Sequence, residues 1–94
     1  MIYVIAYFEN GYCGCDQTDF FEFDDTITTS EIANQMYDAM CGYAESYSHV
    51  AFGWDEPYTD EEWNDYVENQ CMVNWEIVDE DTYRATMREY GFGG

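Results

Sequence analysis

The N-terminal segment, residues 1–8, constrains the fold of this chain more than any other stretch. Its even-numbered residues from Ile2 to Phe8 and its odd-numbered residues from Tyr3 to Tyr7 are all apolar or aromatic. Because successive side chains of a strand point to opposite faces, both faces of this strand are apolar. Such a strand has to be covered on both sides, so we expect it at the centre of a sheet. The segment is too short to span a bilayer and has no basic leader, so we expect a cytoplasmic protein.

Turn residues and helix caps divide the rest of the chain. Asn10-Gly11 predicts a turn, and residues 19–24 predict a second strand antiparallel to the first. Thr28 and Thr59 each precede a glutamate by three residues, which is the spacing of a capping box, and Asp79 marks a third helix start. These signals predict helices from Thr28 to about residue 47, from Thr59 to about residue 71, and from Asp79 to about residue 90.

Two further stretches are apolar at alternate positions. Residues 72–78 predict a strand in which Val73, Trp75 and Ile77 face inward. Residues 48–54 predict either a short strand or an apolar loop. The elements follow the order β-β-α-(β)-α-β-α, which indicates one α+β domain over residues 1–94. Its small antiparallel sheet would have three strands, or four if residues 48–54 join it, and would pack against two or three helices.

The charge of the chain is strongly one-sided. It has 21 Asp and Glu residues against two Arg and no Lys, for a net charge of −19 on 94 residues. With 47% hydrophobic residues it can form a core, so the acids have to lie on the surface. Seven acids lie near helix starts, where their negative charge interacts favourably with the helix dipole and stabilises the helix. At least a dozen have no such local role. These acids repel one another, which indicates an external, basic partner.

Simpler explanations of the charge remain open. Solubility needs a net charge of only about 2–8 in magnitude, and halophilic adaptation fits poorly with the aromatic content. No calcium-loop pattern is present. The possible zinc ligands Cys13, Cys15, Cys41, Cys71 and His49 lack paired CxxC motifs, so we expect free thiols, no metal and no cofactor. With one His, no Lys and no nucleophile or phosphate-loop motif, we expect a protein that is not an enzyme.

The acids are densest in residues 53–68, where they alternate with aromatic residues. A compact domain of this length is about 32 Å across, and duplex DNA carries about 19 charges over that length. We therefore predict a DNA mimic that binds a basic nucleic-acid-binding protein and neither nucleic acid nor membranes. The predicted partner-binding residues are Trp54, Asp55, Glu56, Tyr58, Asp60, Glu61, Glu62, Asp65 and Glu68.

Part of this stretch resembles a known family. Gly53-Trp54, Tyr58, Asp60-Glu61-Glu62 and Asn64-Asp65 are similar to the acidic segment of small phage-encoded anti-CRISPR proteins that inhibit Cas9 as DNA mimics. The resemblance implies that Asp60 and Glu61, with Glu62 beside them, bind the arginines that read the two guanines of the target-adjacent motif. It also implies a CRISPR effector as the partner and the cytoplasm of the bacterial host as the location.

Two other functions stay open from the sequence. The same charge would suit an inhibitor of another nucleic-acid-binding protein, such as a restriction enzyme, a ribonuclease toxin or a repressor. The β-β-α opening and the final Gly93-Gly94 are also features of a ubiquitin-like modifier.

Overall fold

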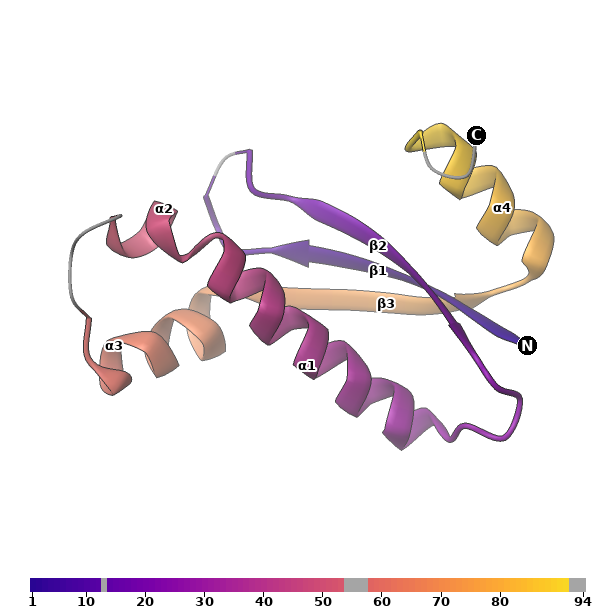
Figure 1. The fold of residues 1–94 in the computed structure, drawn as a ribbon, viewed down its shortest axis with the longest axis horizontal. Coiled ribbons are helices and arrows are strands. Elements are labelled where there is room, and N and C mark those ends of the chain that lie inside the picture. Colours follow the sequence, from indigo (N-terminus) through magenta and orange to yellow (C-terminus); the bar gives the residue numbers. More distant parts are fainter. Residues whose placement is uncertain (13, 54–57, 92–94) are drawn as a thin grey trace.

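The computed structural model describes residues 1–12, 14–53 and 58–91 (Figure 1). The predictions that concern Cys13, residues 54–56 and Gly93-Gly94 lie outside these residues. Along the chain the elements are β1 (Ile2–Glu9), β2 (Gln17–Phe23), α1 (Thr29–Ser46), α2 (Ser48–Phe52), α3 (Asp60–Asp65), the π-helix η1 (Tyr66–Gln70), β3 (Met72–Val78) and α4 (Glu80–Glu89).

The three strands form one antiparallel sheet with the order β2-β1-β3. The predicted α+β class and the central position of the first strand are therefore confirmed. The register places Tyr7 of β1 between Thr18 of β2 and Asn74 of β3. On β1, Val4 and Ala6 have no exposed surface and Ile5 is 1% exposed, as expected for a strand covered on both faces.

One face of the sheet is covered by α1 and η1 and contains the main core. In Figure 1, α1 crosses the strands diagonally. The helix contributes one buried residue per turn to this core, as its apolar spacing predicted. The buried residues of the cluster are Val4, Ala6, Phe8, Ile32, Met36, Met40, Tyr43, Ala44, Tyr66, Val67 and Cys71.

The other face is covered in part by α4. Its Tyr83 is 2% exposed and packs its ring 4.9 Å from that of Tyr3 and 5.7 Å from that of Phe20. Tyr90, at the end of α4, lies 6.2 Å from the Phe20 ring. Among the described residues, α4 ends at Glu89 and no other helix covers the remainder of this face.

The predicted helix starts are confirmed. The Thr59 hydroxyl accepts from the Glu62 N–H, and the Glu62 carboxylate accepts from the Thr59 N–H, which completes the capping box. Thr28 likewise accepts from the N–H of Glu31. Asp79 accepts from the N–H of Thr82, and this bond holds the pKa of Asp79 below its ordinary value. Each of these three helices, α1, α3 and α4, thus begins where a side chain satisfies a free backbone donor.

Residues 48–52 form neither of the two predicted structures, a short strand or an apolar loop. The structure forms the short helix α2 at Ser48–Phe52 instead, so the optional fourth strand is wrong within the described residues. The Gly53 N–H donates to the His49 carbonyl at the end of this turn. Phe52 is held by aromatic contacts, 4.5 Å from the Tyr58 ring and 5.3 Å from the Tyr66 ring. The alternation of apolar residues predicted a strand or a loop and gave no sign of these ring contacts.

The inward position predicted for Ile77 is also wrong, because this side chain is 53% exposed. Val73 and Trp75 do pack against the core. The reason is the diagonal path of α1, which diverges from the C-terminal end of β3 and leaves that end of an edge strand uncovered (Figure 1).

The molecule is flatter and longer than a sphere of its mass. It extends 43 × 29 × 16 Å, with a radius of gyration of 14.9 Å. The diameter of about 32 Å expected for a compact domain of this length is therefore smaller than the observed longest extent of 43 Å. Duplex DNA carries about 25 charges over 43 Å, so the −19 of this protein is somewhat below the duplex value.

The capping box of α3 gives a first prediction. Replacing Thr59 with alanine is expected to lower the free energy of unfolding by about 1 kcal/mol, because the Glu62 N–H loses its acceptor. Urea denaturation of both proteins measures this difference. Thr29→Ala is the matched control, since Thr29 is an exposed first-turn residue of α1. An equal loss in the control would contradict a specific capping effect.

Candidate protein-binding site

The acidic segment predicted to bind a partner forms α3 and η1. Asp60, Glu61 and Glu62 make up the first turn of α3, Asp65 is its last residue and Glu68 lies in η1; all five are exposed. The predicted residues Trp54, Asp55 and Glu56 lie outside the described residues.

The acids of α3 differ in their hydrogen-bond partners. Glu62 is committed to the capping box, where its carboxylate also accepts from the Thr59 hydroxyl. Asp65 accepts from the Asn69 side chain at 2.6 Å. Asp60 and Glu61 have no hydrogen-bond or ion-pair partner among the described residues. These two carboxylates are thus the most available to another molecule.

Aromatic rings connect this acidic segment to the core. Tyr58, which is 46% exposed, lies with its ring 5.7 Å from that of Trp63, and the two residues form a hydrophobic staple across the start of α3. Trp63 is in turn 5.7 Å from the ring of Tyr66, which is 1% exposed. The Tyr66 hydroxyl accepts from the Asn10 side chain at 3.2 Å and donates to the Ala44 carbonyl at 3.3 Å. The acids are therefore carried by a helix that is fixed to the core.

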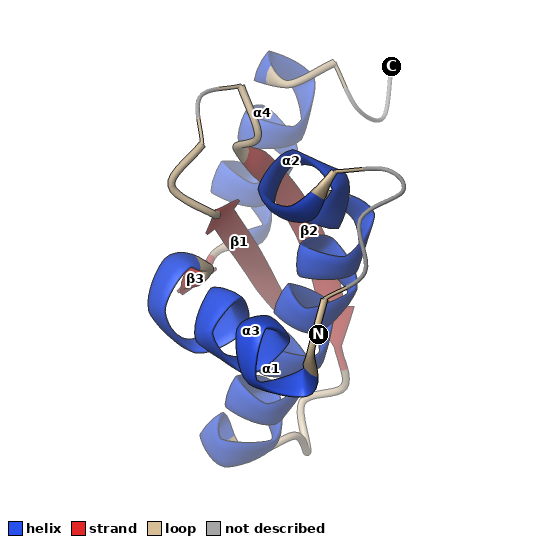
Figure 2. Ribbon diagram, turned by 90° about the vertical axis from the view of Figure 1, so that its left-hand side faces the viewer, coloured by secondary structure: helices blue, strands red, loops and turns tan. Residues whose placement is uncertain are grey.

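The acids and aromatic rings meet at a hollow of about 350 Å³. It lies at the end of the molecule formed by α2 and α3, which faces the viewer in Figure 2. Its lining residues are Tyr12, Ala51, Phe52, Glu61, Glu62, Asp65, Tyr66 and Gln70. We call this the α3 hollow.

The α3 hollow combines two groups that suit a guanidinium ion. Glu61 supplies a carboxylate that can accept paired hydrogen bonds from arginine, and Glu62 and Asp65 each supply one oxygen outside the bonds described above. Phe52 and Tyr12 supply aromatic rings, on which a guanidinium can stack. Sequence reasoning found the acids but missed Tyr12 and Phe52, because these residues come from other segments and no spacing connects them to α3.

The other acids are spread over the surface. Of the 21 Asp and Glu residues, 19 lie in the described residues and none is buried; Asp19 is half-buried and the others are exposed. Few of these carboxylates form an ion pair within the described residues. Arg84 binds Glu80 at 3.1 Å and lies 4.0 Å from Glu22, and the terminal amine binds Asp25. Most of the described carboxylates are thus left without a cation.

The cysteines and the histidine lie apart from this site. Cys15 and Cys71 are buried free thiols, and Cys41 is a half-buried one. Burial raises the pKa of the Cys71 thiol. The His49 ring lies 6.4 Å from that of Tyr47. In residues 1–12, 14–53 and 58–91, no three His, Cys, Asp or Glu side chains are grouped so that they could hold a metal ion.

Burial of Tyr66 predicts a loss of stability in alkali. Burial raises the pKa of Tyr66 from 10.0 to about 12. Since the folded state holds this proton more tightly, the contribution to stability is complete below pH 10 and is lost as the pH rises through about 12. Urea denaturation across this range, with phenolate absorbance recorded in parallel, measures the decline. It should be shallower in Tyr66→Phe; an unchanged slope would assign the effect to other tyrosines.

Comparison with known proteins gives no relative. No family model, no curated protein and no solved structure matches this chain. Among the helices in the described part of the chain, none has both the length and the apolar character needed to cross a bilayer.

Proposed function

We propose that this protein is an anti-CRISPR DNA mimic, which binds the basic cleft of a CRISPR effector such as Cas9 and blocks its binding of DNA. The observation that carries the proposal is that 19 described acids all reach the surface while few have a cation partner. Mutual repulsion of these charges destabilises the fold, and a basic partner would relieve it. The resemblance of residues 53–65 to Cas9 inhibitors selects the effector among basic proteins.

The contact proposed for this function lies on α3. Effectors of this type read their target-adjacent motif with arginines that form paired bonds to guanine. Asp60 and Glu61 offer the same paired acceptors in place of the base. The aromatic wall of the α3 hollow supports a contact of longer lifetime than charge alone provides, since buried aromatic anchors slow release. The role is binding rather than catalysis, and the host cytoplasm is where an effector would be met.

A competition assay tests the proposal. Guide-loaded Cas9 proteins from several bacterial types, and one multi-subunit effector, are offered labelled target DNA with and without this protein, over a series of salt concentrations. We expect displacement of DNA from one effector, at low stoichiometry, that persists near physiological salt. Weak displacement from all effectors, lost as the salt concentration rises, would indicate that the protein acts only as a non-specific polyanion.

The alternative is an inhibitor of another nucleic-acid-binding protein, and the same charge distribution supports it. A restriction enzyme, a ribonuclease toxin and a repressor therefore belong in the same assay, each with its own labelled nucleic acid. Specific displacement from one of these, with none from the CRISPR effectors, would favour this alternative.

A further inference from the structure

The sheet face turned away from α1 has a row of side chains that no helix in the described part of the chain covers. Beneath α4, Ile5 is 1% exposed. Two residues further along β1, the register aligns Tyr7 with Thr18 on one side and Asn74 on the other. Side chains aligned in this way share one face of the sheet. This row forms the floor of an open hollow of about 510 Å³, which we call the sheet hollow.

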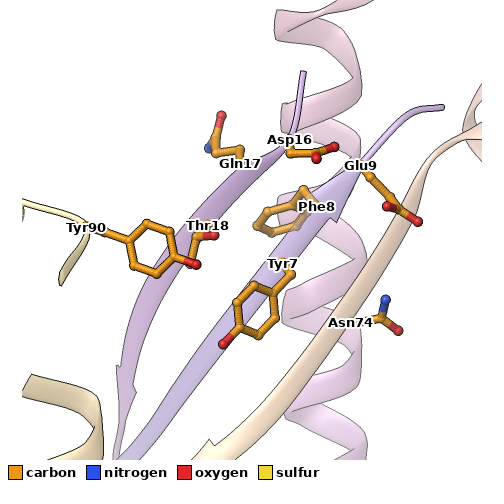
Figure 3. A pocket seen from close by; sticks show the side chains of 8 residues that line it. All are labelled: Tyr7, Phe8, Glu9, Asp16, Gln17, Thr18, Asn74 and Tyr90. Carbon is orange, nitrogen blue, oxygen red and sulfur yellow. The ribbon is translucent and has the colours of Figure 1, made fainter. Parts of the chain in front are cut away.

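Figure 3 shows how the sheet hollow is bounded. Tyr90, 52% exposed, stands on the α4 side. Glu9 and Asp16 lie at the opposite end, where β1 finishes and β2 begins, and both are exposed. The α1 helix lies behind the sheet in this view, so the sheet hollow and the α1 face are on opposite sides of it. Its volume is within the range of roughly 300–1,000 Å³ found for ligand sites.

The lining of the sheet hollow favours a cation. Its lining residues include two carboxylates, Glu9 and Asp16, and two tyrosines, Tyr7 and Tyr90, and none of them is cationic. The Gln17 amide nitrogen donates to Asp19 at 2.8 Å, which leaves the amide oxygen to accept. Burial, with Glu76 as a further cause, raises the pKa of Tyr7. Tyrosine rings favour a planar guanidinium over a compact ammonium ion.

We propose that the sheet hollow is a second docking surface, which receives an arginine side chain of a basic protein between Tyr7 and Tyr90 and pairs it with Glu9 and Asp16. The inference rests on the proposed function for the identity of the partner, which is the protein bound at α3. Charge complementarity selects the occupant: a second copy of this chain would bring another −19 to the same face.

The test is an NMR titration with three short peptides at physiological ionic strength: acetyl-Gly-Arg-Gly-amide, its lysine analogue and its uncharged citrulline analogue. We expect saturable shifts of the backbone amides of Tyr7, Thr18 and Asn74 with the arginine peptide. Binding should be at least about threefold weaker for lysine, because the stacking of the planar ion is lost. The citrulline peptide should not saturate these amides.

Matched variants distinguish a specific arginine site from attraction by the overall negative charge of the protein. Glu9→Gln with Asp16→Asn should weaken binding of the arginine peptide by about fivefold to tenfold, as expected for two exposed ion pairs. Asp38→Asn with Glu45→Gln, on exposed positions of α1, removes the same charge and should change it less than about twofold. Thr18→Lys, which places a cation of the chain itself in the row, should abolish binding. A dispersed spectrum establishes that each variant is folded.

Equal weakening by both neutralised pairs, or equal shifts with arginine and lysine peptides spread over the surface, would overturn the inference. The outcome is separable from that of the proposed function. Peptide binding in the sheet hollow without displacement of DNA from any effector would leave the arginine site standing and remove both the function and the identity assigned to the partner. Displacement without peptide binding here would do the reverse.

Discussion

Replacing Tyr66 with phenylalanine is expected to lower the free energy of unfolding by about 2 kcal/mol, although the ring that packs in the core is kept. The hydroxyl that is removed accepts from the Asn10 side chain and donates to the Ala44 carbonyl. Asn10 has no exposed surface, so water cannot replace the lost partner. A buried donor left unpaired costs its full desolvation energy, and urea denaturation of the two proteins measures that cost.

Tyr58→Phe is the matched control for this experiment. It removes the same atom from a side chain that is 46% exposed and that stacks on Phe52 and Trp63 through its ring. Its effect should lie within about 0.5 kcal/mol of zero. If the two substitutions cost the same, the hydroxyl of Tyr66 contributes nothing specific, and the network around Asn10 is not a source of stability.

The second large effect concerns binding. Charge reversal by Asp60→Lys with Glu61→Lys is expected to weaken binding to the effector found in the competition assay by about 100-fold or more, since two favourable contacts become repulsive. The two side chains are exposed and have no partner within the described residues, so the core should be unaffected. Loss of favourable helix-dipole interactions costs about 0.3–1 kcal/mol each, which circular dichroism and urea denaturation can follow.

Asp38→Lys with Glu45→Lys on α1 is the control for charge. Each pair of substitutions replaces two acids with two lysines and so changes the net charge from −19 to −15. The control should lose less than about fivefold, because exposed charges beyond a Debye length are largely screened. Similar losses from both pairs would mean that the partner senses the total charge and that α3 is not the contact.

The parts of the fold that were predictable from sequence are those decided by close neighbours along the chain. The cap at Thr59 involves a residue three positions away, and the structure contains it as expected. The central position of β1 followed from its own two apolar faces. In contrast, α2 was missed because Phe52 is held by Tyr58 and Tyr66, which follow it by six and fourteen residues. Alternation of apolar residues cannot encode such contacts.

The sequence likewise predicted only those parts of the candidate site that depend on residues close together in the chain. The density of acids in residues 53–68 pointed to α3, because helix caps and charges are visible in the sequence. The α3 hollow needs Tyr12 from the loop after β1, about 50 residues before Glu61, and the sheet hollow needs Tyr90 beside Tyr7. These pairings depend on strand register and helix packing. Ile77 shows the same limit, since its exposure depends on the direction in which α1 crosses β3.

The 16 Å thickness of the molecule affects how its charge is felt from outside. At physiological salt the Debye length is about 8 Å, so a partner docked on one broad face is screened from most of the carboxylates on the other. At ionic strengths near 0.01 M the length is about 30 Å, and the acids of both faces act on the partner together. Affinities measured in dilute buffer would therefore report the total charge of the protein rather than the positions of its individual carboxylates. Only near physiological salt would individual side chains determine which protein is bound.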